Sequence, residues 1–371
     1  MLPRCDIIAG MPSVLLVSSN GAGMGHLTRL LAYGRRMPAD VRRHVVSMSQ
    51  AVPVVAAEGL TWEYLPSQGA TGLRPATWRS LLADRMSEVL GRVDPDVLVF
   101  DGTHPYAGLD VALAAHPRTR AVWSRRAMWK PGRNGPQLDK AAWFDVVLEP
   151  GDLASDADRG ETVTAAATRV RPVTMLDLED LSDRATARAA LGLPADGPLA
   201  LVSLGAGNIN DTGDEVGAAV RALRSQGVGA CVTAPSIAER AYAGDDVHLV
   251  RHFPLSEHFR AFDHVVTAAG YNSVHEALRL GVPALLVPND ATSLDDQVAR
   301  ARHAAERGWA LTARTLTGGG ADALVEELVA RGPELAARAQ AQDPGNGAAD
   351  AAQEILRVAG LAAAPRTGTA S

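Results

Sequence analysis

The sequence predicts two Rossmann-like α/β domains in succession, each built on a parallel sheet. The chain has 371 residues, more than twice the usual length of about 150 for one domain. Short Val/Leu/Ile runs alternate with helix-length segments, which is typical of parallel strands covered on both faces. This rhythm breaks near residue 172 and restarts near residue 198. Because ligands of open α/β sheets bind beyond the carboxyl ends of the strands, two facing sheets would enclose a cleft.

The N-terminal domain is expected to span residues 11–175. The first ten residues precede a second methionine, and we exclude them from the predicted fold. Val14–Val17 reads as a buried strand, followed by a glycine-rich turn and a helix over about residues 26–36. Further strands are expected at 43–48, 62–65, 96–100, 120–123 and 145–148.

The second half repeats this organisation after an acidic stretch, Asp177–Asp180. We expect a linker over 176–197, a nucleotide-sugar-binding domain over 198–360 and a flexible tail over 361–371. The tail is rich in small residues. Strands are expected at 199–203, 230–233, 248–252, 264–267, 284–287 and 309–311.

Composition excludes several classes of protein. A net charge of −6 and a pI near 5.9 argue against broad nucleic-acid binding, which needs a basic surface. Cys5 and Cys231 are too isolated to form a disulfide framework or a thiolate metal site. With no signal-peptide pattern or run of about 18 apolar residues, we expect a cytoplasmic protein. The alanine- and arginine-rich composition suits a bacterium of high GC content.

A glycine-rich loop with Gly21, Gly23 and Gly25 follows the first strand. Glycines allow a sharp turn and a close approach of ligand, and the next helix offers free N–H groups. A dinucleotide-binding loop is the rival interpretation. It is disfavoured because the third glycine is replaced by Thr28 or His26, and residues 48–50 offer no acidic side chain for the ribose.

His26 stands at the start of the helix after this loop. A histidine there could take a proton from an attacking hydroxyl or water. The alternative is that it caps the helix or packs against the turn. Asp101 follows a strong strand and could orient His26, although an aspartate before glycine also forms ordinary turns.

The block from Val265 to Pro288 has a strand running into Gly270, then a helix opening near Asn272 or Ser273. The start of this helix would face a diphosphate. Ser273 could cap the helix. Glu276 could then complete a capping box or accept both hydroxyls of a ribose.

Two further motifs line the same expected edge. Asp295, Asp296 and Gln297 could bind sugar hydroxyls or cap the next helix. Adjacent acids can hold a divalent metal, but no partner cluster supports a metal site, so none is predicted. A loop with Ser203, Gly205 and Gly207 could lie near phosphate, although glycines also form ordinary turns and a P-loop is absent.

A basic segment over residues 118–133 is interleaved with Trp123 and Trp129. It could bind an anionic acceptor, touch a membrane surface peripherally or remain a solvated loop. Trp123 falls on a predicted strand and is expected in the core.

The block 270–288 with Gln297 resembles the nucleotide-sugar site of MurG-like family 28 glycosyltransferases of the GT-B fold. It is more distantly similar to plant and antibiotic GT-B enzymes. The loop 21–26 resembles the glycine-rich loop of their N-terminal domain. The resemblance implies an inverting transfer without a catalytic metal or cofactor. It also implies that Glu276 holds the ribose, that Gly270, Tyr271, Asn272 and Ser273 hold the diphosphate, that Gln297 contacts the sugar with Ser203 and Gly207 nearby, and that Phe253 lies by the base.

The chain departs from that family at Arg300, where asparagine is expected, and at His275, where a small residue is common. The run Gly23-Met-Gly25-His26-Leu-Thr-Arg29 also resembles PseG-like nucleotide-sugar hydrolases, in which the histidine activates water. A non-catalytic nucleotide-sugar-binding protein is a third reading.

We expect an enzyme that moves a hexose-type sugar from a UDP-sugar to an acceptor hydroxyl or amine, releasing UDP. UDP is preferred to TDP because a ribose-binding Glu276 gains from two hydroxyls. The acceptor stays open between a small molecule, a natural-product scaffold and an envelope precursor.

Overall fold

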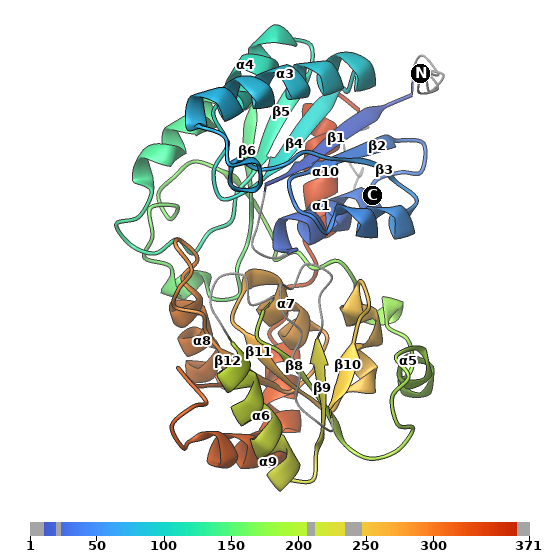
Figure 1. Cartoon of the computed structure of the whole chain (residues 1–371), viewed down its shortest axis with the longest axis vertical. Coiled ribbons are helices and arrows are strands. Elements are labelled where there is room, and N and C mark those ends of the chain that lie inside the picture. Colours follow the sequence, from blue (N-terminus) through green and yellow to red (C-terminus); the bar gives the residue numbers. More distant parts are fainter. Residues whose placement is uncertain (1–10, 20–23, 206–211, 234–246, 362–371) are drawn as a thin grey trace, which may run out of the picture.

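The computed structural model describes residues 11–19, 24–205, 212–233 and 247–361. It contains two α/β domains, one above the other in Figure 1, each with a parallel sheet. The N-terminal sheet has the strand order β3-β2-β1-β4-β5-β6-β7, and the C-terminal sheet has the order β10-β9-β8-β11-β12-β13. The predicted fold class of two Rossmann-like domains is therefore confirmed.

The N-terminal sheet is formed by β1 (Ser13–Ser18), β2 (Arg42–Ser47), β3 (Thr61–Tyr64), β4 (Val97–Asp101), β5 (Arg120–Ser124), β6 (Val146–Pro150) and β7 (Thr168–Val170). Its helices are α1 (Gly25–Arg35), α2 (Gln68–Thr71), α3 (Pro75–Val93) and α4 (Leu109–Ala115), with 3₁₀ turns η1 (Val52–Glu58), η2 (Gly135–Trp143) and η3 (Ser155–Ala157).

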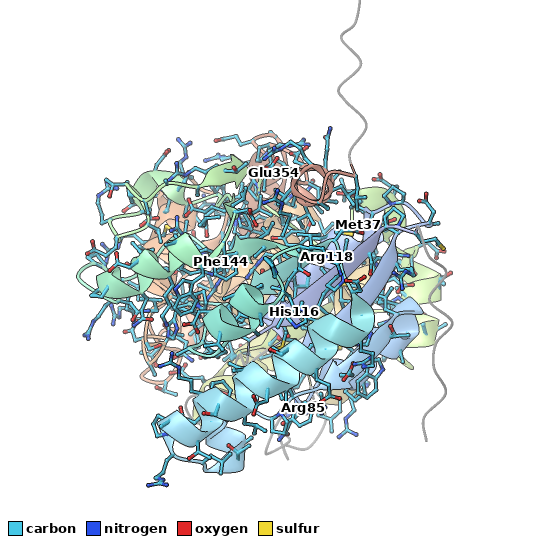
Figure 2. The ribbon with its side chains drawn as sticks, turned by 90° about the horizontal axis from the view of Figure 1, so that it is seen from above. Met37, Arg85, His116, Arg118, Phe144 and Glu354 are labelled. Carbon is cyan, nitrogen blue, oxygen red and sulfur yellow. The ribbon has the colours of Figure 1, made fainter. Side chains whose placement is uncertain are left out.

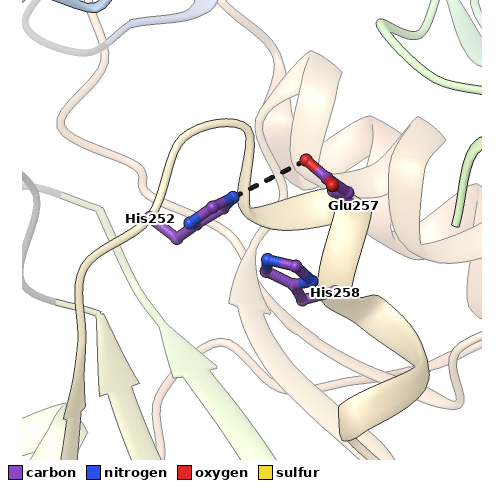
Figure 3. Close-up of side chains that lie close together, drawn as sticks. All are labelled: His252, Glu257 and His258. Carbon is purple, nitrogen blue, oxygen red and sulfur yellow. Dashed lines mark ion pairs between the residues drawn. The ribbon is translucent and has the colours of Figure 1, made fainter. Parts of the chain in front are cut away.

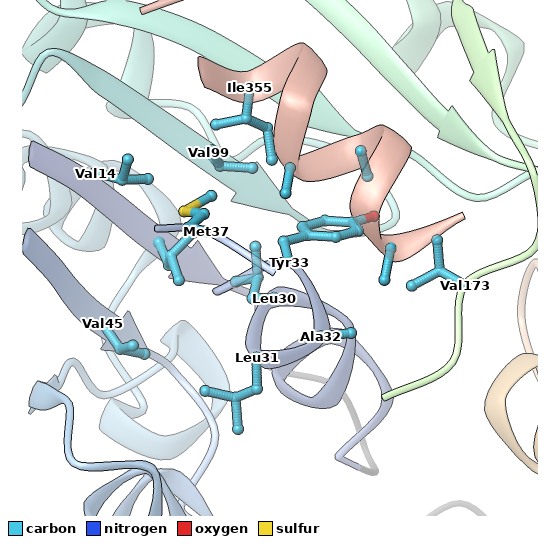
Figure 4. Close-up of a cluster of buried hydrophobic side chains, with 14 of the residues drawn as sticks. Val14, Leu30, Leu31, Ala32, Tyr33, Met37, Val45, Val99, Val173 and Ile355 are labelled. Atoms are coloured by element: carbon cyan, nitrogen blue, oxygen red, sulfur yellow. The ribbon is translucent and has the colours of Figure 1, made fainter. Parts of the chain in front are cut away.

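Alternate residues of these strands face opposite layers, as the two-residue period of a strand requires. Val14 and Leu16 of β1 pack with Val99 of β4 against α1, in the cluster drawn in Figure 4. Leu15 and Phe100 point the other way, into the layer under α3 and α4. The view in Figure 2 looks onto α3, and Arg85 lies on its exposed side.

The C-terminal sheet is formed by β8 (Leu199–Ser203), β9 (Gly229–Thr233), β10 (His248–Val250), β11 (His264–Ala268), β12 (Ala284–Val287) and β13 (Leu311–Thr312). The remaining elements are η4 (Leu178–Asp180), α5 (Arg184–Ala190), α6 (Gly213–Ser225), η5 (Leu255–Ala261), α7 (Tyr271–Arg279), α8 (Gln297–Glu306), α9 (Ala321–Gln340) and α10 (Ala348–Val358). Leu201 and Leu286 face the layer that contains α7 and α8, while Val202 and Leu285 face α6 and α9.

Observed strands match the predicted ones closely, and β8 and β12 coincide with them. The short strand β7 was not predicted, because its three residues Thr-Arg-Val are largely exposed and carry no apolar run. β10 ends at Val250, two residues earlier than expected.

The expected domain boundaries need two corrections. α10 was assigned to the C-terminal domain, yet its apolar face packs in the N-terminal core through Ala351, Ala352 and Ile355. Figure 1 shows this helix, in red, within the upper domain. The chain thus crosses between the domains twice.

The second correction concerns residues 176–197, expected to be a linker. Leu181, Ala187 and Leu193 of this segment are buried in the C-terminal core, and α5 packs against η5. The buried guanidinium of Arg188 donates to the carbonyl oxygen of Ala261 at 3.1 Å. This segment is therefore an integral part of the C-terminal domain.

Within the described residues, no helix is long and apolar enough to cross a membrane.

Candidate active site between the two domains

A cleft of about 1270 Å³ lies between the two domains and is lined by residues of both. It opens at the carboxyl ends of β1 and β4 on one side and of β8 and β11 on the other. At both places the strand order reverses direction, so the loops leaving neighbouring strands diverge and leave a crevice. The predicted cleft is therefore present.

His26 and Asp101 meet at the N-terminal wall of this cleft. His26 is the second residue of α1, and Asp101 is the last residue of β4, the strand next to β1. The Nδ1 atom of His26 lies 2.7 Å from Oδ1 of Asp101. An ionised carboxylate only accepts hydrogen bonds, so Nδ1 carries the proton and Nε2 is left as the basic nitrogen. The predicted pairing of these side chains is present.

Arg29 completes this cluster and was not predicted as a site residue. It lies one turn after His26 on α1, and its Nε and Nη2 atoms donate to both oxygens of Asp101 at 2.7 and 2.5 Å. Ser124 donates to Asp101 at 2.6 Å, and Tyr33 lies 2.9 Å from Ser124. The three-residue spacing from His26 places Arg29 on the same helix face, which is a signal that the sequence contains.

These contacts set the charge states of the pair. Burial lowers the pKa of His26, and the hydrogen bond and charge of Asp101 only partly oppose this. For Asp101, burial raises the pKa, but the charge of Arg29 and the His26 contact outweigh it and hold the pKa at about 2. At neutral pH the dyad therefore comprises a neutral imidazole and an ionised carboxylate, which is the form required of a general base.

α7 begins at Tyr271, with Gly270 as its N-cap residue and no side-chain cap. Ser273 is therefore inside the first turn, and its expected role as the N-cap is wrong. The capping-box interpretation of Glu276 is also wrong, because this residue lies beyond the first turn. The N–H groups of the first turn of a helix have no partners within the helix, and here Gly270, Tyr271, Asn272 and Ser273 all line the cleft.

Asn272 connects the starts of the two helices. Its Nδ2 atom donates to the carbonyl oxygen of Gly25 at 3.3 Å. Gly25 is the first residue of α1 and immediately precedes His26, so the starts of α7 and α1 lie side by side.

Glu276 lines the cleft one turn further along α7. Its contact with a described side chain is a hydrogen bond accepted from Ser256 Oγ at 3.3 Å. Burial raises its pKa to about 7, and Ser256 opposes this only weakly. A carboxyl with so few hydrogen-bond donors around it is suited to accept hydrogen bonds from ligand hydroxyls.

Tyr271 and His275 have structural partners. The Tyr271 hydroxyl donates to Gly151 O at 2.8 Å and accepts from Val173 N at 2.9 Å. Its side chain is thus committed to protein contacts, and only the start of its helix faces a ligand. His275 is fully buried; its Nε2 accepts from Leu153 N at 3.0 Å while Nδ1 lies 2.6 Å from Tyr271 O.

Asp296 is not among the cleft-lining residues; it caps α8 by accepting from Ala299 N at 3.0 Å. Its expected sugar contact is replaced by the helix-cap alternative. Gln297 does line the cleft, and its Oε1 accepts from Asn289 N at 3.0 Å. Its amide nitrogen lies close to Gly270, near the start of α7.

Arg300 occupies the position where the resemblance expected asparagine, and it forms a buried ion-pair network. It donates to Asp152 of the N-terminal domain and to Asp295, each at 2.9 Å, and to Ala269 O at 2.8 Å. Arg126 lies 3.4 Å from the other oxygen of Asp295. Arg300 therefore joins the domains below the cleft.

The basic segment 118–133 is largely engaged in the structure. Trp123 is buried, as expected. Lys130 N donates to Leu294 O at 2.7 Å, and its ammonium group contacts the carbonyl oxygens of Asp290 and Thr292. Arg126 and Arg133 line the cleft. The interpretation as a purely solvated loop is wrong for these residues.

The remaining predicted residues divide into two groups. Ser203, Gly205 and Phe253 line the cleft, as do His104 and Tyr106 on the opposite wall. Gly21, Gly23 and Gly207 lie outside the described residues.

Comparisons with known proteins support the fold and the enzyme class. Residues 235–355 match the glycosyltransferase family 28 C-terminal domain. The chain is 28% identical over 290 residues to a UDP-N-acetylglucosamine--N-acetylmuramyl-(pentapeptide) pyrophosphoryl-undecaprenol N-acetylglucosamine transferase from Nocardioides sp.. That alignment covers 73% of this chain and 76% of the relative.

Among solved structures, MurG of Acinetobacter baumannii superimposes with a TM-score of 0.59 at 16% identity, covering 93% of this chain and 100% of that one. The spinosyn rhamnosyltransferase SpnG, complexed with thymidine diphosphate, gives a TM-score of 0.60 at 17% identity, covering 91% and 98%. These neighbours share the two-domain fold, and the family match covers the half that carries α7 and Glu276. The chain is a glycosyltransferase of the GT-B fold, and its residues 235–355 are similar to the family 28 C-terminal domain.

Proposed function

We propose that this enzyme transfers a hexose-type sugar from a UDP-sugar to an acceptor hydroxyl or amine, with inversion and with His26 as the general base. The observation that carries the proposal is the contact between Asn272 and Gly25. It brings the start of α7, suited to a diphosphate, beside the residue that would activate the nucleophile.

The donor would lie along α7. Its diphosphate would accept hydrogen bonds from the N–H groups at the start of the helix, where the helix dipole favours negative charge. Glu276, one turn further on, would accept the two ribose hydroxyls. The base would then lie by Phe253, on the same wall of the cleft. A ribose offers one hydroxyl more than a deoxyribose, so this arrangement favours UDP.

The acceptor would enter from the N-terminal wall. Nε2 of His26 would remove the proton of the attacking hydroxyl or amine, while Asp101 stabilises the imidazolium that forms. Arg29 neutralises part of the charge of Asp101 and so keeps His26 a moderate base. Inversion then requires that the nucleophile attack the anomeric carbon on the face opposite the departing diphosphate.

The leaving diphosphate would be stabilised by the helix start and by backbone donors rather than by a metal. In keeping with this, the two acidic residues closest to Gln297 are engaged: Asp295 with Arg300 and Asp296 with the helix cap. The proposed reaction requires no cofactor.

A panel of UDP- and TDP-sugars, incubated with the protein without acceptor, tests the donor and the nucleophile. Tight UDP-sugar binding with negligible nucleotide release is expected of a transferase that lacks its acceptor. Rapid release of sugar and nucleotide would instead make water the nucleophile, as in PseG-like hydrolases. Failure to bind any of the nucleotide sugars would refute the proposed donor site.

A further inference from the structure

Two histidines and a glutamate gather beside the donor cleft, in a place that the proposed reaction does not use. His252 follows β10, and Glu257 and His258 belong to η5. One ligand atom from each lies within 4.8 Å of the others. Figure 3 shows the three side chains grouped between the end of the strand and the 3₁₀ turn.

One polar atom of this cluster is buried without a hydrogen-bond partner among the described residues. The separation of 3.7 Å between His252 Nε2 and Glu257 Oε2 is too long for a hydrogen bond. His258 is only 4% exposed, and its Nδ1 atom has no hydrogen-bond partner in the described part of the chain. A buried polar atom without a partner is costly, so this nitrogen indicates an absent ligand.

The two imidazole rings lie close enough together to ligate the same ion. The imidazole rings of His252 and His258 lie 4.3 Å apart between centroids.

We propose that His252, Glu257 and His258 bind one divalent transition-metal ion, with Zn²⁺ as the best match. Two imidazoles and a carboxylate suit zinc and its neighbours, whereas Mg²⁺ and Ca²⁺ favour oxygen ligands alone. Zinc bonds of about 2.0–2.2 Å need donor atoms roughly 3.3 Å apart, which small rotations of partly exposed side chains can reach. Solvent access to His252 and Glu257 provides an entry path.

Such a metal ion would act on residues 253–256, a loop that runs into η5, because its ligands flank both ends. Phe253 and Ser256 of this loop line the cleft, and Ser256 donates to Glu276. Fixing the loop in this conformation would lower the entropic cost of ordering it on nucleotide binding. Zinc and UDP would therefore strengthen each other's binding; this coupling, unlike the metal site itself, rests on the proposed function.

The metal site is tested with the full chain, stripped by a chelator that is then removed. Zn²⁺ is titrated at pH 7.5 against a chromophoric competitor, and Co²⁺ reports ligand geometry through its visible spectrum. One ion per chain is expected, with a Kd of about 1 μM or below. No stoichiometric binding tighter than about 100 μM would overturn the proposal.

Variants assign the ligands. We expect each of three variants to weaken zinc binding at least tenfold: His252→Ala, Glu257→Gln and His258→Gln. Changing a residue that only supports a metal ligand already costs about tenfold, and loss of a ligand itself should cost no less. Two of these positions are partly exposed, so their variants remain informative if the buried His258 variant does not fold. His248→Ala, on strand β10 before His252 and outside the cluster, is the matched control and should bind zinc as the parent does. Parental affinity in both exposed variants would refute the assignment.

The coupling is measured as UDP affinity with and without saturating zinc. For the parent, saturating zinc is expected to tighten UDP binding about fivefold. For Glu257→Gln, zinc should not change the UDP affinity. This variant therefore also controls for complexation of free UDP by zinc. Zinc binding with unchanged UDP affinity would overturn the loop restraint alone. Zinc binding with no UDP binding in either state would refute the proposed function and leave the metal site intact.

Discussion

Replacing Glu276 with glutamine should stabilise the free protein while weakening UDP binding. Burial raises the pKa of this carboxyl from an ordinary 4.5 to about 7. Between these pH values the folded state binds more protons than the unfolded state, so the free energy of unfolding falls as pH rises. The loss of stability caused by the buried charge of Glu276 is absent below about pH 4.5 and complete above about pH 7.

One pKa unit corresponds to about 1.4 kcal/mol, so the raised pKa of Glu276 lowers the free energy of unfolding by at most about 3 kcal/mol. The side chain is half-buried, and water near its exposed part reduces this to about 2 kcal/mol. Glu276→Gln removes the charge at nearly constant volume. We therefore expect a gain of about 2 kcal/mol at pH 8 and almost none at pH 4.5.

Urea denaturation at several pH values between 4.5 and 8 measures this difference, with the exposed-carboxylate variant Glu88→Gln as control for loss of one charge. Calorimetric titration with UDP should show at least a tenfold loss of affinity, since hydrogen bonds to a charged group are worth about 1.5–3 kcal/mol. A variant that is no more stable at pH 8, or that binds UDP as the parent does, would refute the assignment of Glu276 as an uncompensated ribose ligand.

Three further predictions concern the His26–Asp101 pair and the buried Arg300 network between the domains. Asp101→Asn should lower kcat at least 100-fold with little change in UDP affinity, because the amide cannot stabilise the His26 imidazolium; steady-state kinetics with near-parental kcat would contradict this. Since burial lowers the pKa of His26, the acidic limb of the kcat/KM profile should inflect below pH 6.5, and an inflection above that value would exclude His26 as its origin. Arg300→Met should cost about 3–5 kcal/mol of unfolding free energy by leaving buried carboxylates unpaired, whereas Arg302→Met on the exposed face of α8 should cost less than about 0.5 kcal/mol in the same denaturation experiment.

The strands and the His26–Asp101 pair could be predicted from the sequence for a common physical reason. Buried parallel strands consist of uninterrupted apolar residues, so Val14–Val17 and Ala284–Val287 stand out from their surroundings. A residue at the end of such a strand lies at the ligand-binding edge, which is why Asp101 could be matched with His26 before their contact was known.

Other features depend on packing that no local pattern reveals. The amphipathic pattern of α10 shows that one face is buried but not in which domain, and this helix joins the N-terminal core. The Tyr271 hydroxyl is engaged by Gly151 and Val173, which are distant in sequence. Arg300 likewise stands where the resemblance predicts asparagine, and its buried partner Asp152 lies in the other domain.

The most direct test of the account is His26→Ala, assayed for sugar transfer or donor consumption and for UDP affinity. We expect turnover to fall by about 10²–10⁴-fold, the usual contribution of a general base, with the Kd for UDP within about twofold of the parent. Turnover within tenfold of the parent would contradict the proposed role of His26. Loss of UDP binding together with turnover would show that His26 supports the structure of the cleft instead of accepting the proton.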